Sequence, residues 1–85
     1  MGAIDDVLDE RRRQQAKYGR QDYEPFLWSA ILNEEAGEFA QAAVDSRFGG
    51  SNAGVDRMRE EAIQVAAVGI AIVECIDRGR WKWGY

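Results

Sequence analysis

Helical periodicity runs through most of this chain and is broken at only two places. Alternating apolar and polar runs bounded by turn residues, which are typical of strands, are absent from the sequence. The first break, YGRQDYEP, ends in the single proline, Pro25, which suits the first turn of a helix. The second break is the glycine-rich segment FGGSNAG. The sequence therefore predicts an all-α fold with helices over about 3–18, 25–47 and 52–78, and a tail over 79–85.

The length of 85 residues allows a single domain, 1–85, with a small core. Its one cysteine, Cys75, excludes an intrachain disulfide, so helix packing and oligomerisation remain as sources of stability. The third predicted helix is apolar on nearly all sides from Ala62 to Val73, which is more than a three-helix protomer can cover. We therefore predict an antiparallel three-helix protomer that forms four-helix-bundle-like homodimers or homotetramers.

Charge and hydropathy argue against two classes of partner. The net charge of −4 is unfavourable for nucleic-acid binding. The longest apolar run, AIQVAAVGIAIV, is too short to span a bilayer and contains Gln64. The N-terminal segment is acidic and lacks the apolar stretch of a signal peptide. We therefore expect a cytoplasmic protein without nucleic-acid or membrane partners, in which Cys75 is a small core residue.

Acidic residues lie on the apolar faces of two predicted helices. On an ideal helical wheel, Glu35 falls in the centre of the apolar arc of the second helix, Glu38 falls inside that arc and Glu34 lies at its edge. On the third helix, Glu61 shares a stripe with apolar side chains, and Gln64 follows one turn later. Antiparallel packing would bring four oxygen-bearing side chains together: Glu35, Glu38, Glu61 and Gln64.

Neighbouring buried carboxylates repel each other and are costly unless they are paired, protonated or bound to metal. Salt bridges to arginines of the first or third helix are one solution. A divalent cation is the better one, because oxygen-only ligands suit Mg²⁺, with Mn²⁺ as a substitute. Gly37 would then let another helix approach closely beside the metal. The chain has no histidine, so a di-iron site with Glu-x-x-His pairs is set aside.

The motifs EEAGE and REEAIQ resemble those of the MazG-type, all-α nucleoside triphosphate pyrophosphohydrolases. That family has Glu-Glu-x-x-Glu on one helix and Glu-x-x-Asp on the next. The flanking stretches ERRRQQAKYG, FLWSAILNEEAGEFAQA and MREEAIQVAAVGIAIVECIDR extend the resemblance over roughly residues 8–78. The resemblance implies antiparallel helices assembled as dimers or tetramers, and Mg²⁺-dependent hydrolysis of nucleoside triphosphates to a monophosphate and pyrophosphate. It matches Glu35, Glu38 and Glu61 to metal ligands.

Further roles follow from the chemistry that the resemblance implies. A carboxylate that does not bind metal, Glu34 or Glu38, would orient or deprotonate the attacking water. Lys17 and Arg78 would contact phosphates. Each also lies at the predicted end of a helix, where a cationic side chain commonly interacts with the last backbone carbonyl groups. Trp28 would stack on the base, although core packing is the more common role of such a residue.

The sequence departs from the family pattern at Gln64, where the family has aspartate. An amide oxygen can bind Mg²⁺, but the cluster loses one negative charge. An alternative function is therefore a non-catalytic helical module that serves oligomerisation or partner binding. A dimerisation domain with ordinary salt bridges, unrelated to nucleotides, is a third interpretation.

Overall fold

The computed structural model describes residues 2–51 and 53–83 and contains three helices and no strand in these ranges. The helices are α1 (Ala3–Tyr18), α2 (Pro25–Phe48) and α3 (Val55–Asp77). The all-α prediction is confirmed, and α1 has the predicted bounds. Of the predicted tail, residues 84 and 85 lie outside the described ranges.

Local capping explains where α2 begins and ends. The Glu24 carboxylate accepts hydrogen bonds from the backbone N–H groups of Phe26, at 3.0 Å, and Leu27, at 2.6 Å. Pro25 occupies the first helical position, as predicted. The helix ends at Phe48, and the next residue, Gly49, closes it in the left-handed region with φ of 85°.

Helix α3 begins at Val55, three residues later than predicted. Gly54 has φ of 122°, which is incompatible with a helix. Its backbone N–H donates to the Ser46 hydroxyl at 2.9 Å, so the link is folded back on the end of α2. The hydrogen bond between Gly54 and Ser46 thus occupies the segment that the sequence pattern had assigned to the first turn of the third helix.

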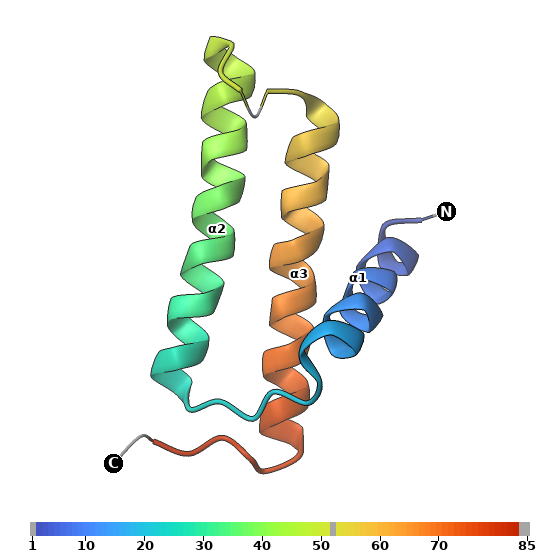
Figure 1. Cartoon of the computed structure of the whole chain (residues 1–85), viewed down its shortest axis with the longest axis vertical. Helices are drawn as coiled ribbons and strands as arrows, with labels where there is room; N and C mark the ends of the chain where they lie inside the picture. Colours follow the sequence, from blue (N-terminus) through green and yellow to red (C-terminus); the bar gives the residue numbers. More distant parts are fainter. Residues whose placement is uncertain (1, 52, 84–85) are drawn as a thin grey trace.

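Helices α2 and α3 form an antiparallel hairpin, and α1 crosses the outer side of α3 at an angle (Figure 1). In the described chain α1 packs on α3 and not on α2, so the three helices do not enclose a common core. Two ion pairs between α1 and α3 hold this arrangement. Arg11 Nε lies 2.7 Å from Glu74, and Arg59 lies 2.6 Å from Asp6.

The core lies between α2, α3 and the segment that connects α1 to α2. Its buried members are Trp28, Val68, Ala71 and Cys75. Trp28 is 4% exposed, and its ring lies 5.0 Å from that of Tyr23 in the connecting segment. The core role expected for Cys75 is therefore confirmed, and Trp28, predicted to stack on a base, is packed in the core, which is the more common role of such a residue.

Apolar side chains remain exposed along both long helices. The larger of them include Phe26, Phe39, Val44, Phe48, Val55, Val73 and Ile76. A Cβ added at Gly37 would meet no described atom of another segment within 4 Å. The close approach of another helix that was expected at Gly37 is therefore absent from the described protomer. None of the described helices is long and apolar enough to cross a membrane.

Candidate metal centre and adjoining cavities

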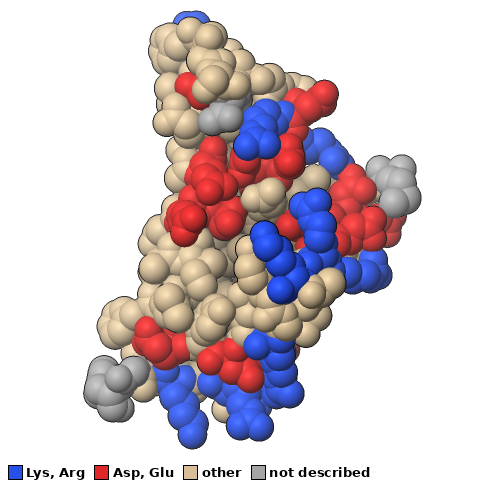
Figure 2. Space-filling view, viewed as in Figure 1, with Lys and Arg blue, Asp and Glu red and all other residues tan. Residues whose placement is uncertain are grey.

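Three carboxylates from the two long helices meet on one face of the hairpin. Glu35 and Glu38 lie one turn apart on α2, and Glu61 faces them from α3. One carboxylate oxygen from each residue lies within 4.8 Å of the others. Acidic side chains gather where α2 and α3 run side by side (Figure 2). The antiparallel packing thus brings together the three glutamates that the sequence singled out.

The three carboxylates differ in burial. Glu61 is 3% exposed and Glu35 is half-buried, whereas Glu38 is exposed. The Oε2 atoms of Glu35 and Glu61 are buried and have no hydrogen-bond partner in the described chain. A buried oxygen without a partner is unfavourable, and a bound cation would satisfy both. This donor set, which contains oxygen alone, fits Mg²⁺ or Mn²⁺.

Arginines only partly neutralise the cluster. Arg57 lies 3.2 Å from Glu61 Oε1, one turn earlier on α3. Arg11, the buried arginine of α1, pairs with Glu74 and not with the cluster. The salt-bridge interpretation therefore accounts for one oxygen of Glu61 and leaves both buried Oε2 atoms unexplained.

The surroundings raise the pKa of both inner carboxyls. Burial is the main cause of the raised pKa of Glu35, and the nearby charges of Glu38 and Glu61 add to it. Burial also raises the pKa of Glu61, where the charge of Arg57 opposes the shift and Glu38 reinforces it. The cluster is therefore poorly stabilised in its fully ionised form without a further cation.

A polar cavity of about 380 Å³ adjoins the cluster on the α1 side. It is lined by Glu10, Arg13, Gln14, Lys17, Tyr18, Glu35 and Gln64. Lys17 and Gln64, both predicted site residues, therefore open on the same space as Glu35. Arg13 was not predicted, because nothing in the run of arginines from 11 to 13 shows which one will face this space.

A second cavity, of about 280 Å³, is lined by aromatic and aliphatic side chains together with several polar ones. Its walls include Tyr18, Tyr23, Trp28, Ile31, Val68 and Ala71, together with Gln14, Gln21, Glu34 and Glu35. The buried Nε1 of Trp28 has no hydrogen-bond partner in the described chain. Both cavities are lined by Gln14, Tyr18 and Glu35, so Glu35 borders both spaces.

Arg78 lines neither of these cavities. Its guanidinium lies 2.6 Å from Asp22 and donates to the backbone oxygen of Gln21 at 3.3 Å. This ion pair lowers the pKa of Asp22 and fastens the segment between α1 and α2 to the end of α3. Of the three predicted substrate-binding residues, the structure therefore places Lys17 and Trp28 beside the cluster and gives Arg78 a structural role.

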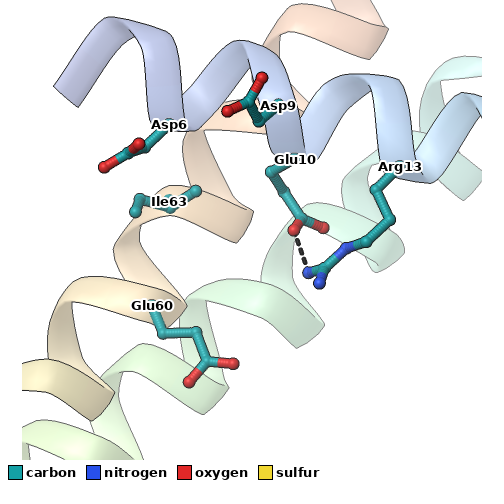
Figure 3. A pocket seen from close by; sticks show the side chains of 6 residues that line it. All are labelled: Asp6, Asp9, Glu10, Arg13, Glu60 and Ile63. Carbon is teal, nitrogen blue, oxygen red and sulfur yellow. Dashed lines mark hydrogen bonds and ion pairs between the residues drawn. The ribbon is translucent and has the colours of Figure 1, made fainter. Parts of the chain in front are cut away.

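A third hollow, of about 270 Å³, separates α1 from the first half of α3 (Figure 3). Its lining residues are Asp6, Asp9, Glu10, Arg13, Glu60 and Ile63. Glu10 forms an ion pair with Arg13 on the same helix. Since this pair also lines the polar cavity, Arg13 lies between two acidic regions.

Comparison with known proteins gives no match to a family model, to a curated protein or to a solved structure. The chemistry of the site therefore follows from the residues themselves.

Proposed function

We propose that the protein is a divalent-metal-dependent nucleotide pyrophosphohydrolase, of the MazG-like kind that the sequence resembles. The observation that carries the proposal is the meeting of Glu35, Glu38 and Glu61, with two buried carboxylate oxygens that lack partners. These residues would hold Mg²⁺ or Mn²⁺, with Gln64 as a further oxygen donor. When bound, the ion would neutralise phosphate charge and stabilise the charge that develops during hydrolysis.

The two cavities support a nucleotide as the substrate. The aromatic cavity beside Trp28 and Tyr18 would hold the base, where the exposed ring of Tyr18 offers a stacking surface. The polar cavity would hold phosphates beside Arg13 and Lys17. A nucleoside triphosphate has the same division into an apolar end and a charged end. Glu34 or Glu38, both exposed, would orient or deprotonate the attacking water.

The second candidate function is a non-catalytic helical module. Gln64 favours it, because an amide in the place of a carboxylate weakens the attraction for a divalent cation. The two functions differ in turnover, since a module of this kind would not hydrolyse nucleotides.

A product screen tests the proposed reaction. We expect Mg²⁺ or Mn²⁺ to support release of pyrophosphate and a nucleoside monophosphate from at least one canonical or modified triphosphate. The measurement is phosphate-product analysis over a nucleotide panel, with EDTA as the metal-free control. Metal binding without turnover would favour the non-catalytic module. Absence of both would refute the metal centre.

We also propose that the protomers assemble into homodimers or homotetramers. Phe39 and Val44 on α2, and Val73 on α3, are exposed although they lie on apolar stretches of long helices. Burying such side chains between protomers stabilises the fold by about 25 cal/mol per Å² of apolar surface. Sedimentation at micromolar concentration should therefore give a mass above that of the protomer. A monomer of normal helicity would contradict this prediction.

A further inference from the structure

Among the residues that the structure describes, Arg57 is the cationic residue that forms an ion pair with the cluster of Glu35, Glu38 and Glu61. Its Nη2 lies 3.2 Å from Glu61 Oε1, and its Nη1 lies 3.1 Å from Glu60 Oε2. The arginine side chain is 44% exposed, whereas the Glu61 side chain is 4% exposed. A partly exposed cation thus pairs with the most buried member of the cluster.

This contact has a consequence for cation binding. The guanidinium cancels part of the negative charge that a divalent ion would need, and it would repel an ion bound to the same carboxylate. Gln64 adds no negative charge that could offset this effect. In the metal-free protein the cluster therefore has one negative charge fewer than a four-carboxylate site would have, and one of its carboxylates, Glu61, is already paired with Arg57.

Arginine is also well suited to phosphate. Its planar guanidinium can donate two parallel hydrogen bonds to phosphate oxygens, and it keeps its charge at all working pH values. Arg57 can leave Glu61 once a metal ion compensates that buried carboxylate, because the arginine side chain is 44% exposed and is held by single contacts to Glu60 and Glu61.

We propose that Arg57 is an exchange residue: it pairs with Glu61 in the metal-free protein and binds a phosphate oxygen of the nucleotide when Glu61 holds metal. Metal and nucleotide should consequently bind cooperatively, each more tightly when the other is present. This proposal rests on the proposed function, which supplies the metal and the phosphate.

The test compares Arg57→Gln with Arg59→Gln. Arg59 is a matched control because it lies two residues further along α3 and pairs with Asp6 of α1, away from the three cluster carboxylates. Calorimetric titrations would use Mn²⁺ alone and the Mn²⁺ complexes of α,β-methylene analogues of a purine and a pyrimidine nucleoside triphosphate. Circular dichroism would show that both variants keep the native helicity.

We expect Arg57→Gln to bind Mn²⁺ alone about fivefold more tightly than the native protein, because a repelling charge is gone. The same variant should bind the Mn²⁺–analogue complexes more weakly, and Arg59→Gln should change neither affinity. Equal Mn²⁺ affinities in the two variants would overturn the proposal. Tighter Mn²⁺ binding by Arg57→Gln, with no hydrolysis of any nucleotide by the native protein, would support the exchange at Glu61 and refute the proposed reaction.

Discussion

Glu61→Gln should stabilise the metal-free protein at neutral pH and abolish both metal binding and turnover. Glu61 is buried and only one of its oxygens is paired. Replacing it with a neutral side chain of nearly equal shape removes a poorly compensated charge, and we expect a gain of about 1 kcal/mol in the free energy of unfolding. The same change removes a cluster carboxylate, so millimolar Mn²⁺ should no longer raise the melting temperature.

The gain should depend on pH in a defined direction. Because the pKa of Glu61 is raised on folding, the folded protein binds this proton more tightly than the unfolded chain. In the native protein the associated stability is present below the unfolded pKa, about 4.3, and is lost as pH rises through the higher folded pKa. The advantage of Glu61→Gln over the native protein should therefore grow from about pH 4 to pH 7.

Melting curves in EDTA and in Mn²⁺, recorded across this pH range, would check both expectations. Asp77→Asn is the control for the same change of charge at an exposed position in the last turn of α3: removing an acid from a helix C-terminus should itself stabilise by about 0.3–1 kcal/mol, and the response to Mn²⁺ should be unchanged. A Glu61→Gln protein that is less stable than the native one at pH 7 in EDTA would show that Glu61 is adequately compensated without metal.

Gln64→Asp should have the opposite effect on the cluster. If Gln64 is a metal ligand, the new carboxylate attracts a divalent ion by about 2 kcal/mol even at a water-like dielectric constant. That corresponds to a metal affinity about 30-fold higher. The metal-free variant should be less stable than the native protein, because a fourth acid joins Glu35, Glu38 and Glu61.

Titration with Mn²⁺ and melting curves in EDTA distinguish this role from a purely structural one. A Gln64 that only forms a hydrogen bond across the cavity predicts the same destabilisation with and without metal. Unchanged Mn²⁺ affinity in Gln64→Asp would remove position 64 from the site and leave three glutamates to hold the ion.

The sequence by itself determined the helices and the chemistry that they carry. Helical periodicity and the single proline set the bounds of α1 and the start of α2, because capping and backbone geometry are local properties. The three-four spacing placed Glu35 and Glu61 on apolar faces, and both are at least half-buried. A helical wheel suffices for this, because each position follows from 100° per residue.

The wheel could not decide how far the partner helix covers each face. The apolar arc of helix α2 is broad, so the pattern does not show which part of it a partner covers, and Glu38 is exposed although it lies inside that arc. Only the packing of α3 against α2 determines which part of that arc is covered.

The position of α1, and with it the roles of the cationic residues, was decided by tertiary structure alone. The pairs Arg11–Glu74 and Arg59–Asp6 join residues more than 50 positions apart, and no local pattern encodes such a choice. They accompany the packing of α1 on the outer side of α3, where Arg13 and Lys17 open on the cavity beside Glu35. Arg78, which resembles Lys17 as a charge at a helix end, instead pairs with Asp22. The difference arises because an exposed cation pairs with whichever acid the packed helices bring within reach.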